Sequence, residues 1–116
     1  MATKRQVETK LRQLIKRLDQ TDREVRGSLA ESLPESRIIE VTITDLDVSY
    51  WTELDGGRMD GLHHGTPREA EILVRVSSDH LIELVDGRKS LFSAYLSGQV
   101  RIEASISDLL RLRRLA

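Results

Sequence analysis

The chain has 116 residues, of which 18 are Lys or Arg, 19 are Asp or Glu and 3 are His, and its formal net charge is −1. This length, with 39 % hydrophobic residues, is typical of one globular domain and excludes a disordered chain. Because it has no Cys, no apolar leader and no apolar run near the ~20 residues of a membrane span, we expect a cytoplasmic protein without disulfides or thiol chemistry.

The N-terminal region is predicted to be helical. Thr3 followed by Gln6 forms a capping box at its start. The helix is expected over residues 4–32, with a break near 19–21 or at Gly27. Its apolar residues recur at helical spacing and include Val7, Leu11, Leu14, Ile15 and Leu18.

An alternation of apolar and polar residues then predicts strands. The alternating stretches are 39–43, 48–54, 59–64 and 72–76, of which 59–64 is the weakest. A turn is expected at 44–47, because the parity of the alternation changes there. Asp55-Gly56-Gly57 is a strong hairpin signal between the second and third strands.

After the fourth strand, the spacing of apolar residues changes back to that of a helix. Ser77-Ser78-Asp79 is suited to begin a helix, which Asp86-Gly87 ends. A short helix over residues 89–97 follows, with Gly98 as its stop. A last strand is expected over 100–104.

The terminal helix has an unusually broad apolar face. Ser105 and Asp108 form a capping pair at its start. At 100° per residue its apolar side chains cover an arc of roughly 220°, and Arg113 falls inside that arc. Such an arc indicates a second apolar neighbour, which is another helix, a partner chain or a lipid, unless the helix simply lies between the sheet and the first helix. The apolar residues are Ile106, Leu109, Leu110, Leu112 and Leu115.

These elements predict an α+β fold in the order α-β-β-β-β-α-α-β-α, with a mostly antiparallel sheet. Residues 1–116 are expected to form a single domain. Within it, an N-terminal helical region spans 1–33, a sheet with two inserted helices spans 34–104, and a C-terminal helix spans 105–116.

The sequence lacks the motifs of an enzyme. No nucleophile elbow, phosphate loop or dinucleotide fingerprint is present. Asp60, His63 and Glu69 could meet around a divalent ion, but His63 and His64 point to opposite faces of a strand, and an exposed histidine pair is the simpler interpretation. We therefore expect no catalytic residue, no metal and no cofactor.

A pair of carboxylates at Asp45 and Asp47 is explained by a tight turn rather than by acid–base chemistry.

Charge is distributed unevenly along the chain. Residues 1–26 carry eight basic and four acidic side chains, and residues 107–116 carry three and one. Basic ends around an acidic centre could favour transient contact with an anionic membrane surface. Solvated helix faces explain the charges more simply, and without aromatic residues for base stacking in these segments a nucleic-acid partner is not expected.

Three segments follow one another in a characteristic order and are followed by a short leucine-rich helix. They are Ile39–Glu53 with Asp55-Gly56-Gly57, then Ala70–Ser77, and then Leu91-Phe92-Ser93-Ala94-Tyr95-Leu96-Ser97-Gly98-Gln99-Val100-Arg101-Ile102. In this order of segments, residues from about 38 to 115 resemble the sterol carrier protein type-two family, also called the non-specific lipid-transfer domain.

Three positions depart from the family pattern. Arg88-Lys89-Ser90 stands where the family usually has Asn-Pro, and Ala104-Ser105 stands in place of Gly-Asp. The chain ends in Arg114-Leu115-Ala116 rather than in the peroxisomal Ser-Lys-Leu, which favours a bacterial or other non-peroxisomal member.

The resemblance implies a five-stranded sheet with helices on one face and an apolar tunnel between the layers. The tunnel would hold a fatty acid, a fatty acyl chain or a sterol-like ligand without catalysis. Candidate wall residues are Leu81, Leu84, Val85, Phe92, Tyr95 and Leu96; candidates at the mouth are Leu109, Leu110 and Leu112, with Arg113 as polar anchor. The alternative is an interaction or homodimerisation module without a physiological lipid.

Overall fold

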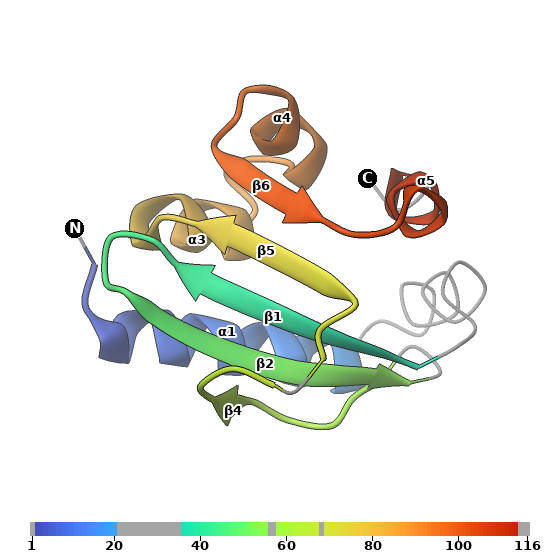
Figure 1. Ribbon diagram of the computed structural model, residues 1–116. Helices are drawn as coiled ribbons and strands as arrows, with labels where there is room; N and C mark the ends of the chain where they lie inside the picture. Colours follow the sequence, from blue (N-terminus) through green and yellow to red (C-terminus); the bar gives the residue numbers. More distant parts are fainter. Residues whose placement is uncertain (1, 21–35, 56–57, 68, 114–116) are drawn as a thin grey trace.

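The computed structural model describes residues 2–20, 36–55, 58–67 and 69–113, with side chains left out for 17–20, 58–59, 92 and 111–113. The predicted helix over 21–32 and the glycines of the 55–57 turn lie outside the described residues. The elements are α1 (Lys4–Gln20), β1 (Arg37–Ile43), β2 (Val48–Asp55), β3 (Arg58–Met59), β4 (His63–His64), β5 (Ile72–Val76), α3 (Ser78–Val85), α4 (Leu91–Leu96), β6 (Val100–Glu103) and α5 (Ile106–Arg113) (Figure 1).

The predicted α+β fold and its mostly antiparallel sheet are confirmed. The strands follow the order β3-β2-β1-β5-β6, and β4 also pairs with β2, so the described sheet is five strands wide. β1 and β5 are parallel, with Val41 opposite Val74, whereas the other pairs are antiparallel.

The prediction of one strand over 59–64 is wrong, because this segment forms two short strands on the same edge of β2. The carboxylate of Asp60 accepts hydrogen bonds from the backbone N–H of Glu53 at 3.0 Å and from the hydroxyl of Thr52 at 3.2 Å. Gly61 then has a φ of 135°, which L side chains rarely adopt. The chain therefore bends away from β2 before β4 pairs with it again.

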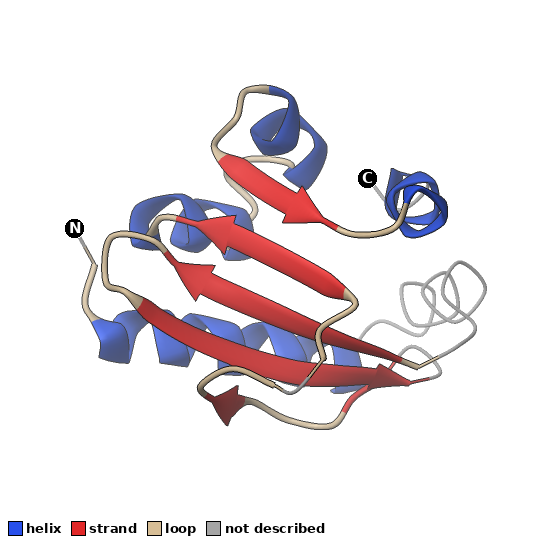
Figure 2. Cartoon of the chain, viewed as in Figure 1, coloured by secondary structure: helices blue, strands red, loops and turns tan. Residues whose placement is uncertain are grey.

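The two faces of the sheet differ in chemistry. The register places apolar side chains on one face, among them Ile39, Val41, Ile43, Tyr50, Leu54, Ile72, Val74, Val76, Val100 and Ile102. Helices α1 and α3 lie behind the sheet in Figure 2, next to each other, and they cover this apolar face. The opposite face carries polar side chains, such as Thr42 and Ser49, whose hydroxyls are 3.0 Å apart. Packing on one face only explains the strict alternation of the strands.

Local caps begin and end the helices at the predicted residues, except that Ser90, which was not predicted as a cap, begins α4. Thr3 and Gln6 form the reciprocal capping box, at 2.8 and 3.2 Å. Three serine hydroxyls accept a hydrogen bond from the backbone N–H three residues later, in the pairs Ser77–His80, Ser90–Ser93 and Ser105–Asp108. Gly87 and Gly98 adopt φ values of 74° and 78° and end α3 and α4.

Candidate functional site

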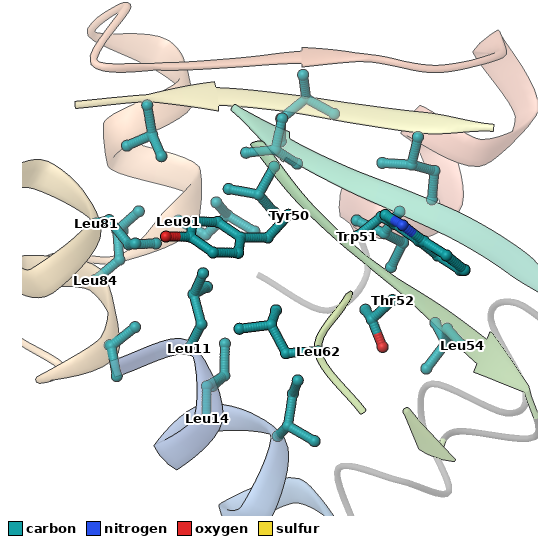
Figure 3. Close-up of a pocket in the computed structure, with 18 residues that line it drawn as sticks. Leu11, Leu14, Tyr50, Trp51, Thr52, Leu54, Leu62, Leu81, Leu84 and Leu91 are labelled. Atoms are coloured by element: carbon teal, nitrogen blue, oxygen red, sulfur yellow. The ribbon is translucent and has the colours of Figure 1, made fainter. Parts of the chain in front are cut away.

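A cavity of about 390 Å³ lies between the apolar face of the sheet and the helices that cover it (Figure 3). Its lining comes from α1, α3, four strands, the residue before β4 and the start of α4. The eighteen lining residues are Leu11, Leu14, Ile15, Ile39, Val41, Tyr50, Trp51, Thr52, Leu54, Leu62, Ile72, Val74, Val76, Leu81, Leu84, Val85, Leu91 and Ile102.

None of these eighteen side chains carries a charge, and few carry a polar atom. Tyr50 is only 1 % exposed, and burial raises the pKa of its hydroxyl, with the nearby carboxylate of Glu8 adding to the effect. Figure 3 shows Tyr50 directed toward α3, between Leu81 on that helix and Leu11 on α1. The cavity therefore offers dispersion contacts along most of its surface and almost no group that would select a polar ligand.

Part of the predicted wall lies at this cavity. Leu81, Leu84 and Val85 line it from α3. Tyr95 and Leu96 do not line it and are 41 % and 69 % exposed, and the side chain of Phe92 lies outside the described residues. Leu91, the first residue of α4, lines the cavity instead.

The predicted mouth residues lie on α5, of which Ile106–Leu110 have described side chains. Leu109 and Leu110 do not line the cavity, and Leu110 is 57 % exposed. The side chains of Leu112 and Arg113 lie outside the described residues. Within the described part, α5 instead connects to the start of β1, because Asp108 accepts a hydrogen bond from Nε of Arg37 at 3.0 Å.

Most of the lining was not among the residues predicted for the site. Leu11, Leu14 and Ile15 belong to the apolar stripe of the first helix, and the strand residues belong to the predicted alternation. Both signals were visible in the sequence. Neither signal distinguishes a cavity wall from a packed core, because both require the same apolar side chains.

The two adjacent histidines occupy opposite sides of β4, as the strand geometry predicts. His63 stacks on Trp51, with ring centroids 4.2 Å apart, and lies 3.1 Å from the Asp60 carboxylate. His64 lies 2.9 Å from the carboxylate of Glu8 on α1. The side chains of His63 and His64 are 42 % and 63 % exposed, as predicted, and their contacts also hold β4 against its neighbours beside the cavity.

The carboxylate of Asp60 is held by hydrogen bonds to its neighbours on β2 and to His63. Burial alone would raise the pKa of Asp60, but hydrogen bonds from the Glu53 N–H, His63 and Thr52 outweigh it and lower that pKa. Among the described residues, no three His, Asp or Glu side chains form a group that could hold a metal ion. The predicted turn explains Asp45 and Asp47, since Asp47 has a φ of 50° and Asp45 binds the start of α3.

The sequence matches the model of the SCP-2 sterol transfer family over residues 9–116. The chain belongs to this family. No curated protein matches the sequence. In the part of the chain that the structure describes, no helix combines the length and apolar character needed to cross a membrane.

Solved structures of low sequence identity share the fold. A UbiJ-SCP2 ubiquinone synthesis protein is 16 % identical, with a TM-score of 0.63 over 99 % of this chain and 92 % of that chain. Palmitated SCP2L2 from Aedes aegypti is 12 % identical, with a TM-score of 0.63 over 94 % and 92 %. An inverting sec-alkylsulfatase from Pseudomonas sp. is 16 % identical, with a TM-score of 0.57 over 78 % of this chain but only 14 % of its own length.

Proposed function

We propose that this protein binds, and transfers without catalysis, an apolar lipid with a long hydrocarbon portion, such as a fatty acid, a fatty acyl chain or a sterol-like molecule. The observation that carries the proposal is the uncharged cavity of about 390 Å³ between the sheet and α1 and α3. Cavities of roughly 300–1,000 Å³ are typical of small-molecule sites. A palmitated relative of the same fold supports a fatty acyl ligand.

The energetics of such a site follow from burial. Each methylene that leaves water for an apolar cavity stabilises the complex by about 0.8 kcal/mol. Affinity then depends on the apolar area of the ligand more than on its head group. We accordingly propose a carrier that accepts several lipids in the cytoplasm rather than an enzyme with one substrate.

A substitution inside the cavity tests this proposal. Val74 is on the central part of β5 and lines the cavity, whereas Leu73 is on the opposite face of the same strand. In the Val74→Phe variant the ring would displace at least two methylenes of a bound chain and weaken binding of a fluorescent fatty acid about fifteenfold. Leu73→Phe is the matched control and should bind as the wild type does.

The stability of the two variants completes the test. If the space above Val74 is open, the larger side chain fits without strain, and the thermal unfolding midpoint is retained. If the space is closely packed, overpacking costs about 1–3 kcal/mol and the midpoint falls. Unchanged fatty-acid affinity in Val74→Phe would refute the assignment of this cavity as the lipid site.

We further propose that, when a lipid is bound, the end of α5 covers the mouth of the cavity, so that Leu109 and Leu110, which do not line the cavity in the structure, and Leu112 face the ligand and Arg113 binds a fatty-acid carboxylate. A charge-assisted hydrogen bond of this kind contributes about 1.5–3 kcal/mol when it is partly desolvated. Truncation after Asp108 should then abolish retention of a fluorescent fatty acid but leave the sheet folded. Arg113→Ala should weaken binding of acids more than of alcohols of equal length.

A second candidate function is an interaction or homodimerisation module. Its support is the exposure of apolar side chains on α4 and α5, where Leu96 is 69 % exposed and Ile106 is 78 % exposed. Native mass spectrometry separates the two functions. A monomer that carries a co-purified fatty acid supports the carrier, whereas an empty dimer supports the module.

A further inference from the structure

A second pocket, of about 430 Å³, has the opposite chemistry to the lipid cavity. It lies where β5 leads into α3 and where α4 leads into β6. Polar and basic residues form most of its lining, and Val76 borders both the pocket and the cavity. The lining residues that the following argument uses are Arg75, Ser77, His80, Gln99 and Arg101.

Two arginines face each other in this pocket. Arg75 and Arg101 are directly opposite across the antiparallel pair of β5 and β6, so their side chains project from the same face of the sheet. Both are exposed. Like charges in this position are destabilising, and the ion pairs formed among the described residues include neither arginine. The pair therefore concentrates two positive charges, neither of which forms an ion pair within the described part of the chain.

Further polar groups surround the arginine pair. The hydroxyl of Ser77 accepts a hydrogen bond from the backbone N–H of His80 at 3.3 Å and keeps its own proton for another acceptor. The carboxamide oxygen of Gln99 is buried and has no hydrogen-bond partner in the described part of the chain. Buried polar atoms of this kind usually find a partner in water or in a ligand. The hydroxyl of Ser77 thus adds a donor to the arginine pair, and the oxygen of Gln99 is an unsatisfied polar atom beneath the pocket wall.

The dipole of helix α3 is not what would attract an anion to this pocket. The carboxylate of Asp45 already accepts the backbone N–H of Ser78 at 2.8 Å, and Asp79 adds a second negative charge to the first turn. Glu103 follows Arg101 by two residues on the same face of β6, but it does not line the pocket. The positive charge at the site comes from Arg75 and Arg101.

We propose that this pocket binds a phosphomonoester, with its phosphate between Arg75 and Arg101. A phosphomonoester carries close to two negative charges near neutral pH, and the planar guanidinium group matches phosphate oxygens in pairs of hydrogen bonds. This site is independent of the proposed lipid cavity, which lies on the other face of the sheet.

Titration with inorganic phosphate tests the site directly. Phosphate replaces chloride at constant ionic strength, and backbone amide signals are followed by NMR. We expect saturable shifts at Ser77, His80 and Gln99, and at least tenfold weaker binding in Arg75→Gln and in Arg101→Gln. Arg88→Gln is the matched control, because Arg88 is an exposed arginine beyond the end of α3 that does not line the pocket. Shifts that do not saturate, or equal affinity in all three variants, would overturn the proposal.

The unfolding midpoint of each variant shows whether a loss of phosphate binding results from misfolding. Removing one of two opposed like charges should retain or raise the unfolding midpoint in phosphate-free buffer. Val74→Phe should leave phosphate affinity unchanged, so that failure of the lipid proposal and failure of this one are separate results.

Two further probes identify the source of the phosphomonoester. Glycerol 3-phosphate is a free metabolite with hydroxyls beside its phosphate, and vesicles of phosphatidylcholine with phosphatidic acid display the same group on a membrane. Saturable binding of glycerol 3-phosphate alone assigns a soluble ligand. Co-sedimentation with phosphatidic acid vesicles that the arginine variants lose, and that pure phosphatidylcholine does not support, assigns a lipid head group. Binding of neither probe refutes a phosphomonoester site.

Discussion

A single buried serine connects three parts of the chain. The hydroxyl of Ser78 donates to Oδ2 of Asp45 at 2.6 Å and accepts from the backbone N–H of Ala2 at 3.1 Å. Its backbone N–H donates to Oδ1 of the same carboxylate at 2.8 Å. The start of the chain, the turn between β1 and β2 and the first turn of α3 therefore meet at one side chain that is fully buried.

Replacing this side chain should lower stability. Ser78→Ala leaves the Ala2 N–H and one oxygen of Asp45 without their partner, and a buried hydrogen bond lost in this way costs about 1–3 kcal/mol. Urea unfolding monitored by circular dichroism measures the loss. Ser93→Ala, at an exposed position of α4, is the control and should stay within about 0.5 kcal/mol of the wild type.

The same junction makes stability depend on pH. The hydrogen bond from the Ser78 hydroxyl, supported by the Ser78 N–H and only partly opposed by burial, lowers the pKa of Asp45 below its usual 3.8. A lowered pKa stabilises the folded state above the unfolded pKa, and this contribution is lost as the pH falls through the folded value. The stability difference between the wild type and Asp45→Asn should be constant above about pH 5 and shrink below about pH 4. A difference that grows on acidification would contradict the assignment.

Elements whose limits depend on local chemistry were predicted well. The capping box of Thr3 and Gln6 and the glycine stops at Gly87 and Gly98 act within one helical turn, so a short stretch of sequence contains all the interacting groups. The strands that alternate strictly were predicted for the same reason, because one face alone is buried.

Elements that depend on distant partners were predicted less well. The parallel pairing of β1 with β5 joins segments about thirty residues apart, and alternation within a strand does not specify its neighbour. The division of the third strand depends on Asp60 bonding back to Thr52 and to the Glu53 N–H, which becomes apparent only once β2 is beside it. A change in the spacing of apolar residues indicates where a strand lies, but it does not indicate which strand pairs with it.

The terminal helix is connected to the sheet by a buried ion pair. The side chain of Asp108 is 4 % exposed and that of Arg37, which begins β1, is 14 % exposed. The sequence predicted Asp108 only as a capping residue of α5. Its backbone N–H does bind Ser105, but its carboxylate is directed to Arg37 across 71 residues of sequence.

Removing the charge of Asp108 should destabilise the protein strongly. Asp108→Ala leaves the guanidinium of Arg37 largely buried without this partner, and breaking a buried pair on one side costs about 3–5 kcal/mol. Guanidinium unfolding gives the magnitude, with Glu103→Gln as an exposed control on β6. A loss below about 1 kcal/mol would show that the pair is solvated in solution and that α5 is held by other contacts.

At the scale of the whole molecule, the sequence predicts the composition of the space between the layers but not its size. Leu81, Leu84 and Val85 were predicted for the site and line the cavity, while Leu11 and Leu14, in the apolar stripe of the first helix, were not predicted for the site and line it as well. An apolar residue that faces another layer either packs against it or borders a void. The distance between the layers determines whether the residue is packed or borders a void. This distance results from the sum of many contacts rather than from any local sequence pattern.

The size of the cavity can be measured with ligands of graded length. If the lipid binds by burial alone, each added methylene in a series of saturated fatty alcohols should lower the dissociation constant about fourfold, from about 0.8 kcal/mol per methylene. The gain should stop at the length where the chain no longer fits between the sheet and α1 and α3. Displacement of a fluorescent fatty acid gives the affinities.

The same series in Val74→Phe should reach its limit at a shorter chain, because the ring occupies part of the same space. Affinities that do not change along the series would mean that the cavity is not where the hydrocarbon binds, and the exposed side chains of α4 and α5 would then be the next surface to test.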